Sequence, residues 1–195
     1  MTRYLGTAIR MTILTAILLG LVYPLAITGI AQVLFPGAAN GSLVKVNGKV
    51  IGSSLIAQDF TAAKYFHPRP SAAGAGYDAM ASSASNLGPT SSILMDRVKA
   101  SVSKELAQNP GLRSGAVPVD MVTTSGSGLD PDVTVANARA QAPRVAAARD
   151  MSLASVLTLV TRHTTGRQLG FLGEPRVNVL QLNLALDAAQ GHTGP

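Results

Sequence analysis

The feature that most constrains this chain is an uncharged apolar stretch near its N-terminus. After Arg10 the sequence reads MTILTAILLGLVYPLAITGIAQVLF, residues 11–35, and the next charged residue is Lys45. A helix that crosses about 30 Å of hydrocarbon needs about 20 apolar residues, and this stretch supplies them. Pro24 lies inside it, and transmembrane helices accept proline where a neighbouring helix or side chain satisfies the freed carbonyl. The stretch predicts a membrane-spanning helix.

A cleaved signal peptide is the alternative interpretation, since Gly29 and Ala31 are small residues at the spacing that signal peptidase requires. The apolar core of a signal peptide usually has about 7–15 residues, and the longer stretch here favours an uncleaved anchor. Arg3 and Arg10 precede the span, and no Lys or Arg follows it until Lys45. The positive-inside rule then puts the N-terminus in the cytoplasm and the rest of the chain outside the cytoplasmic membrane.

Charge and cysteine content narrow the classes of function. The net charge is +6, from 16 Lys and Arg against 10 Asp and Glu. The basic residues are dispersed and are not interleaved with aromatic residues, which argues against nucleic-acid binding. The chain has no cysteine, which excludes disulfides, thiolate metal sites and cysteine catalysis.

Local signals divide the chain into three parts and predict an α+β fold. We expect a short cytoplasmic tail and anchor helix at 1–36, a single mixed extracytoplasmic domain at 37–190 and a flexible tail at 191–195. Asn47-Gly48 is the strongest short signal for a β-hairpin. Residues 65–91 are rich in Gly, Pro, Ser and Ala, and we interpret them as an ordered irregular segment that docks on another surface.

The second half of the domain carries helical signals. We expect helices at 90–108 and at 152–164, the latter capped by Ser152, because apolar residues recur there at helical spacing. Residues 117–124 are a short strand candidate. Asp130-Pro131 predicts a helix start, and Pro143 predicts a break. Residues 177–187 fit either a helix or an alternating strand, and the helix is favoured.

The stretch TTSGSGLDPDV, residues 123–133, has three interpretations: a phosphate loop, a flexible linker or a tight turn. A Walker loop needs a Lys after its glycines, and here Leu129 and Asp130 follow. A linker is disfavoured because Leu-Asp-Pro fixes the backbone. The sequence favours a tight turn and helix cap at which backbone packs closely.

No catalytic, cofactor or metal site is predicted. The three histidines are His67, His163 and His192, and no nucleophile elbow, His pair or calcium loop accompanies them. Arg69 lies between two prolines, where a rigid backbone suits docking to a partner's carboxylate, although a solvated surface arginine explains it equally well.

Several stretches, taken in order, carry a family resemblance. They are YPL at 23–25, ANGSL at 39–43, YFHPRPSA at 65–72, SNLGPTS at 85–91, VDMVTTSGSGLDP at 119–131, RVAAAR at 144–149 and LGEPRVNVLQLNLALD at 172–187. The ordered set resembles the C subunit of the Kdp potassium-transporting P-type ATPases of bacteria. The resemblance covers nearly the whole chain.

The resemblance implies a non-catalytic subunit of a four-protein inner-membrane complex, with no cofactor of its own. The implied partners are a P-type ATPase that carries the phosphorylated aspartate, a channel-like potassium-translocating subunit and a very small single-span subunit, together with the lipid bilayer. The implied role is assembly, stability and support of high-affinity potassium uptake. A role in promoting ATP binding would conflict with the topology predicted above.

This chain departs from the family in two places. The family commonly has His after GLDP, where Asp132 stands here, which argues against an indispensable imidazole at that position. It also has a glycine-rich SGGSN where SSASN stands at 82–86, so this loop accepts side chains at those sites.

We expect the loops 65–89 and 125–131 to contact the potassium-translocating partner. The docking candidates are Tyr65, Phe66, Arg69, Asn86, Leu87, Ser125, Gly126 and Asp130. The alternative function is a stand-alone, membrane-anchored periplasmic ligand-binding domain or enzyme, which would work without partners.

Overall fold

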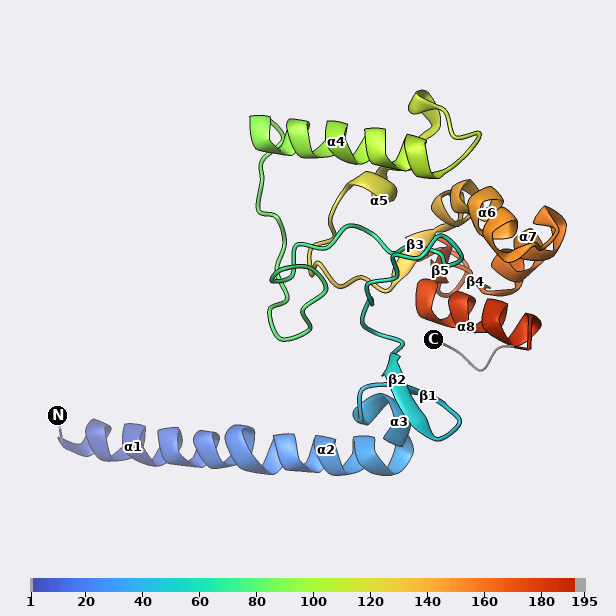
Figure 1. Ribbon diagram of the computed structural model, residues 1–195. Helices are drawn as coiled ribbons and strands as arrows, with labels where there is room; N and C mark the ends of the chain where they lie inside the picture. Colours follow the sequence, from blue (N-terminus) through green and yellow to red (C-terminus); the bar gives the residue numbers. More distant parts are fainter. Residues whose placement is uncertain (1, 192–195) are drawn as a thin grey trace. The chain divides into compact units, whose positions relative to one another are not determined.

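A computed structural model of the chain describes residues 2–191, and only the backbone of Thr2 and Arg3 (Figure 1). His192 and nearly all of the predicted tail at 191–195 lie outside the described residues. The structure forms two compact units that divide after Leu43, whereas the sequence predicted a boundary at residue 36. The short helix α3 (Pro36–Ala39) belongs with the first unit because it packs on the end of the preceding helix.

The first unit is a long apolar helix in three sections. They are α1 (Thr2–Ile17), a π-helical turn η1 (Leu18–Val22) and α2 (Tyr23–Leu34). Residues 4–34 are long and apolar enough to cross a membrane, and none of the 18-residue apolar window is buried within the chain. The wide turn lies directly before Pro24, and the Tyr23 amide bonds to the Leu18 carbonyl. The turn thus absorbs the missing proline N–H without a sharp kink.

The second unit contains two small sheets and five α-helices among the described residues. Its elements are β1 (Leu43–Val46), β2 (Lys49–Ser53), α4 (Ser92–Gln108), η2 (Ser114–Ala116), α5 (Val119–Val122), β3 (Asp132–Thr134), α6 (Val135–Arg149), α7 (Leu153–Arg162), β4 (Thr164–Thr165), β5 (Arg176–Asn178) and α8 (Val179–Ala189). This mixture of helix and strand confirms the predicted α+β class.

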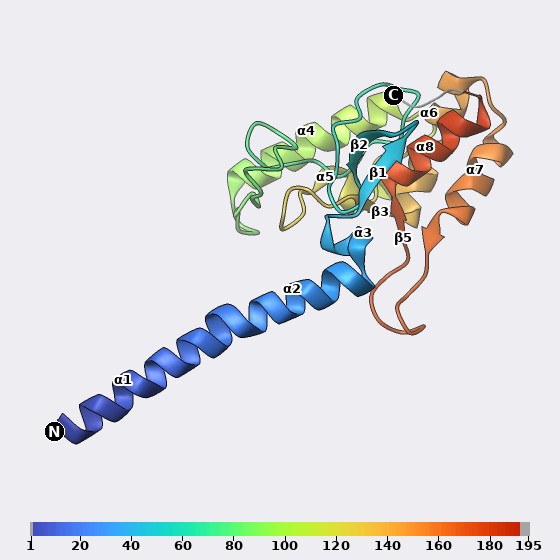
Figure 2. The same ribbon diagram turned by 90° about the horizontal axis from the view of Figure 1, so that it is seen from below.

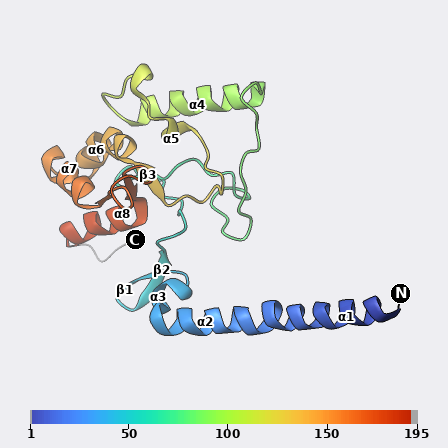
Figure 3. The same ribbon diagram turned by 180° about the vertical axis from the view of Figure 1, so that it is seen from behind.

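Figures 1 and 2 place α7 and α8 at one end of the second unit and α4 at the other, with β3 and β5 between them. The three-stranded sheet has the order β3-β5-β4 and is antiparallel, with Val133 opposite Val177. The view from behind shows α6 beside α7, with α8 next to them (Figure 3). The core lies among these helices and β5, and is built from Phe66, Val133, Ala138, Ala142, Val145, Ala146, Val156, Val160, Val177, Val179, Leu182 and Leu186.

Several local predictions are confirmed. The hairpin turns at Asn47-Gly48, both with positive φ as a type I′ turn requires. The helix predicted at 90–108 is α4, with Ser91 as its N-cap. The helix predicted at 152–164 is α7, with Ser152 as its N-cap.

Three predictions are wrong. The strand candidate at 117–124 is the short helix α5, whose Asp120 carboxylate accepts bonds from the Thr134 amide at 2.7 Å and the Asn137 amide group at 3.0 Å. Asp130 does not cap a helix, because residues 132–134 pair with β5 and α6 starts only after Thr134. Pro143 does not break α6.

Residues 177–187 combine both alternatives that the sequence left open. Arg176–Asn178 forms the central strand β5, and α8 begins at Val179 with Asn178 as its N-cap. The favoured helix is therefore correct for most of the segment, and the strand for its first residues.

Candidate functional site

The irregular segment after residue 60 docks on the helices of its own domain. Residues 63–67, here called the clamped segment, lie along α6 and α8. Each of its five carbonyl oxygens accepts a side-chain hydrogen bond: Ala63 from Arg144 at 2.6 Å, Lys64 from Arg149 at 2.6 Å, Tyr65 from Arg144 at 2.9 Å, Phe66 from Asn183 at 2.9 Å and His67 from Gln141 at 3.0 Å. The clamped segment is held as an extended peptide would be held in a receptor, by side chains instead of a neighbouring strand.

Two amide side chains each form a pair of hydrogen bonds with this backbone. The Asn183 carbonyl accepts from the Phe66 amide at 2.8 Å, and the Gln141 carbonyl accepts from the His67 amide at 2.8 Å. Each amide thus donates to and accepts from a single residue of the clamped segment. Such paired bonds satisfy buried backbone groups that would otherwise be destabilising.

Arg144 connects three parts of the domain. Its guanidinium donates to the Asn109 side chain at 3.0 Å and to Gln141 at 2.6 Å, in addition to its two bonds with the clamped segment. Asn109 caps the end of α4 and donates to Glu105 at 2.9 Å. Arg144 therefore joins α4 and α6 to the clamped segment through one buried cation.

Arg149 forms a second buried cluster with α8. It pairs with Asp187 at 2.7 Å, and both side chains are almost fully buried. Its guanidinium also lies 5.0 Å from the centre of the Tyr65 ring, while the Tyr65 hydroxyl donates to Asp187 at 3.2 Å. The charges are neutralised locally, so this cluster is structural.

The stretch 123–133 is a tight turn against neighbouring backbone, as the sequence favoured. Gly128 has a φ of +68°, and a Cβ built on it would lie 2.5 Å from the Ser83 carbonyl oxygen and 2.8 Å from the Ala73 nitrogen. Ser127 accepts through its carbonyl from the Ser83 amide at 3.0 Å. The loops 65–89 and 123–133 therefore form one packed surface.

The structure brings two of the predicted docking residues together. Arg69 pairs with Asp130 at 3.2 Å and donates to the Thr124 carbonyl, also at 3.2 Å. The Asp130 carboxylate accepts from the Asp132 amide at 3.0 Å, closing an Asx turn. Arg69 is thus neither a free surface arginine nor an unpaired anchor for a partner's carboxylate.

The remaining docking candidates differ in exposure. Tyr65 and Phe66 are buried and hold the domain together, so they offer no surface to a partner. Ser125 is also buried, and its hydroxyl accepts from the Asp130 amide at 3.4 Å. Asn86 and Gly126 are exposed, and Leu87 is half-buried. Arg69 and Asp130 are half-buried as well, so these two residues keep some side-chain surface beside the last three.

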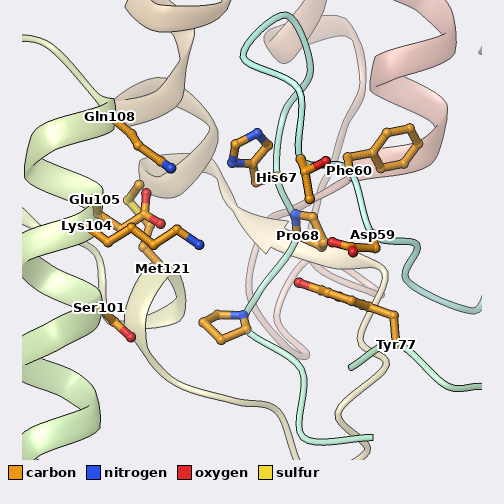
Figure 4. Close-up of a pocket in the computed structure, with 12 residues that line it drawn as sticks. Asp59, Phe60, His67, Pro68, Tyr77, Ser101, Lys104, Glu105, Gln108 and Met121 are labelled. Carbon is orange, nitrogen blue, oxygen red and sulfur yellow. The ribbon is translucent and has the colours of Figure 1, made fainter. Parts of the chain in front are cut away.

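A polar cleft of about 210 Å³ separates α4 from residues 59–77 (Figure 4). Lys104, Glu105 and Gln108 face it from α4, opposite His67 and Tyr77. The Gln108 side-chain oxygen is buried without a hydrogen-bond partner. Burial raises the pKa of Glu105 and raises the pKa of Tyr77 to about 12.

The histidine in this cleft is not poised as a base at neutral pH. Burial, and then the positive charge of Arg144, lower the pKa of His67 to about 4. Its ring nitrogen lies 3.2 Å from the Ala62 carbonyl oxygen. Across residues 2–191, no group of three or more His, Asp or Glu side chains is placed to hold a metal ion.

Sequence reasoning did not identify the side chains that hold the clamped segment. Asn137, Gln141 and Arg144 lie three or four residues apart, which is the spacing usual for one face of a helix. Polar residues in that position are a signal that a helix buries hydrogen bonds, and they could have indicated the clamp.

The fold and surface define a class of protein: a domain with a polar, internally braced surface, joined to a single apolar helix able to cross a membrane. Comparison with known proteins identifies the family within this class. The family described as "KdpC: K+-transporting ATPase, c chain" matches residues 5–188, and the chain belongs to that family.

Named relatives agree over nearly the full length. The potassium-transporting ATPase KdpC subunit of Koribacter versatilis is 58% identical over 97% of both chains. That of Rhodospirillum rubrum is 57% identical over 96% of both chains. That of Mycobacterium tuberculosis is 55% identical over 96% of this chain and 99% of the relative.

Proposed function

We propose that this chain is a non-catalytic accessory subunit of an ATP-driven, high-affinity potassium uptake complex. It would support the assembly and stability of a channel-like potassium-translocating subunit, a P-type ATPase subunit and a small single-span subunit. The observation that carries the proposal is the family match over residues 5–188, which includes both the anchor helix and the braced domain.

The proposed topology puts the N-terminus in the cytoplasm and the domain in the periplasm. Arg10 lies near the start of the apolar helix, and the next basic residue after the helix is Lys45. Positive charge on the N-terminal side favours that end as the cytoplasmic one. The ATP-hydrolysing site would then belong to a partner on the opposite side of the membrane.

The proposed docking surface is the joint surface of loops 65–89 and 123–133. The ion pair of Arg69 and Asp130 and the close packing at Gly128 fix its shape. Asn86, Leu87 and Gly126 present exposed atoms on it. A surface fixed before binding loses little conformational entropy when a partner docks.

Co-purification tests the function. The full chain, tagged after Gln190, is extracted in mild detergent from potassium-starved cells of its source, and bound proteins are identified by mass spectrometry. We expect a P-type ATPase and a channel-like subunit, with potassium-stimulated ATP hydrolysis by the complex. A chain that purifies alone would refute the proposal and favour the stand-alone ligand-binding domain or enzyme.

The docking surface has its own test. Asn86→Arg and Gly126→Arg place bulky charge on the surface, and each should lower the recovery of partners about tenfold or more. Ser114→Arg, on an exposed residue of η2, is the matched control and should leave recovery unchanged. Equal recovery with all three variants would show that partners bind elsewhere.

A further inference from the structure

The chain contains two Asn-Gly pairs, Asn40-Gly41 and Asn47-Gly48. An asparagine side chain can lose ammonia when the backbone nitrogen of the next residue attacks its carbonyl carbon, Cγ. Glycine favours this attack, because it has no Cβ to obstruct the approach and leaves the backbone free to rotate. The two pairs share this intrinsic reactivity, and the structure gives them different surroundings.

Both reacting groups of the second pair are free. Asn47 and Gly48 are exposed in the turn between β1 and β2 (Figure 1), with φ of +51° and +79°. The hydrogen bond of such a turn joins its first and fourth residues, which leaves the amide of the third residue, Gly48, outside it. Within residues 2–191, no hydrogen bond engages the Asn47 side chain or the Gly48 amide. The attacking nitrogen and the carbon that it attacks are therefore both available.

The first pair is held by hydrogen bonds. The Asn40 side-chain nitrogen donates to the Gln32 side-chain oxygen at 3.0 Å and to the Pro36 carbonyl at 2.7 Å. The Gly41 amide, which would be the attacking group, donates to the Ala38 carbonyl at 3.1 Å. These bonds must break before the reaction can begin. Asn40 itself is exposed, so hydrogen bonding, and not burial, distinguishes the two pairs.

The hairpin that carries the second pair can open at low cost. β1 and β2 form a sheet of only two strands, and none of their residues is fully buried. Hairpins of two strands are marginally stable, and segments with few buried contacts open locally far more often than a core does. Such opening gives the backbone of the turn the rotation that brings the Gly48 nitrogen to the side chain of Asn47.

We propose that Asn47 is a site of spontaneous deamidation, with water as the only co-reactant. The Gly48 nitrogen gives its proton to solvent and bonds to Cγ of Asn47. The bond from Cγ to Nδ2 breaks, and the released nitrogen takes up a proton and leaves as ammonia. Water then opens the resulting five-membered cyclic imide at either carbonyl, which yields aspartate or isoaspartate. The net change consumes one water and releases one ammonia, with no oxidation or reduction.

The product changes the hairpin in two ways. Either acid places a negative charge between Lys45 and Lys49, where the chain has none. Isoaspartate also carries the backbone through the former side chain and lengthens the turn by one carbon. Since β1 ends at Val46 and β2 begins at Lys49, the turn has two residues, and its length sets the register of the strands. Isoaspartate in the turn should therefore loosen the pairing of β1 with β2, irreversibly, as the protein ages.

Mass spectrometry tests the proposal on the full chain, and the test needs no partner. The purified protein is incubated in mild detergent at mildly alkaline pH and then digested with trypsin, which cleaves after Lys45 and so separates Asn40 from Asn47. The change in mass from amide to acid is followed in both peptides. We expect Asn47 to convert about tenfold faster or more, because the hydrogen bonds at Asn40 add to the barrier. Equal rates, or faster conversion of Asn40, would overturn the proposal.

Two controls assign the difference to the structure. When the chain is digested before the incubation, neither pair keeps its hydrogen bonds, and both should convert at similar rates. A difference of the same size in the free peptides would show that the fold does not set the rates. Gln32→Ala removes one bond from Asn40, so conversion of Asn40 should rise while that of Asn47 stays unchanged.

A variant of the turn locates the reaction. Asn47→Gln has a side chain that is one carbon longer and must close a six-membered ring, which is slow. Labelling of the aged protein by a protein isoaspartate methyltransferase should therefore disappear in Asn47→Gln. Labelling that persists in this variant would place the reaction at another residue and refute the assignment to Asn47.

Discussion

Arg144 satisfies more buried groups than any other side chain described above. Lysine at this position keeps the charge but cannot reach Asn109, Gln141 and two carbonyls at once. We expect Arg144→Lys to lower the free energy of unfolding by about 3 kcal/mol, because buried acceptors lose their donors. Arg139→Lys, on an exposed position of α6, should change it by less than about 0.5 kcal/mol. Urea unfolding followed by circular dichroism measures both, and equal effects would contradict the clamp.

The buried His67 side chain should make the stability of the domain depend on pH. Its pKa is about 4 in the folded domain, and an unfolded histidine has a pKa near 6.5. Between these values the unfolded chain binds more protons, so stability should fall as the pH drops from about 6.5 toward 4. Burial raises the pKa of Glu105, so the folded domain binds the proton of this carboxyl more tightly than the unfolded chain does. Protonation of Glu105 should therefore raise the stability as the pH falls, which is opposite to the effect of His67.

The comparison of variants isolates the histidine. The loss of stability between pH 7 and pH 5 should be smaller in His67→Gln than in the unaltered chain. Denaturant midpoints at the two pH values give the measurement. An identical loss in both proteins would mean that the buried imidazole does not set the pH dependence.

At the scale of elements, the contact between loops 65–89 and 123–133 depends on Gly128. Gly128→Ala must shift backbone at Ser83 and Ala73 and also strains a left-handed residue, so we expect about 2–4 kcal/mol of destabilisation. Gly126→Ala meets open space and should change stability by less than about 0.5 kcal/mol. Thermal unfolding compares the pair, and similar values would contradict the close packing.

Elements with local signals could be predicted from the sequence. The hairpin at Asn47-Gly48 and the capped helices α4 and α7 depend on neighbouring residues, and all three are confirmed. The predicted helix start at Asp130 was wrong because residues 132–134 pair with β5, which lies more than 40 residues later in the chain. The predicted break at Pro143 was wrong because burial of Ala142 and Val145 keeps α6 intact despite one lost hydrogen bond.

The candidate site was only partly predictable, for the same reason. An ordered, docked segment at 65–91 follows from its composition, and close backbone packing at 123–133 follows from its glycines. The partner of Arg69 is Asp130, 61 residues away, and no local pattern joins them. Burial of Tyr65 and Phe66 likewise depends on α6 and α8, so the docking candidates included residues that face inward.

At the scale of the whole molecule, topology is directly testable because the chain has no cysteine. Ser114→Cys puts a single thiol on an exposed residue. A membrane-impermeant maleimide should label it in intact spheroplasts, without permeabilisation. Labelling only after the membrane is opened would place the domain in the cytoplasm and reverse the proposed orientation.

The clamped segment has a consequence for the order in which the domain is built. Phe66 bonds to Asn183, 117 residues later in the chain, and Tyr65 bonds to Arg144, 79 residues later. Synthesis delivers the segment before α6 and α8, so its bonds to Asn183 cannot form until α8 has emerged. Closing such long loops is slow compared with forming helices. The first half of the domain therefore cannot complete its native contacts before the last helix is made, and folding is completed only when almost the entire chain is present.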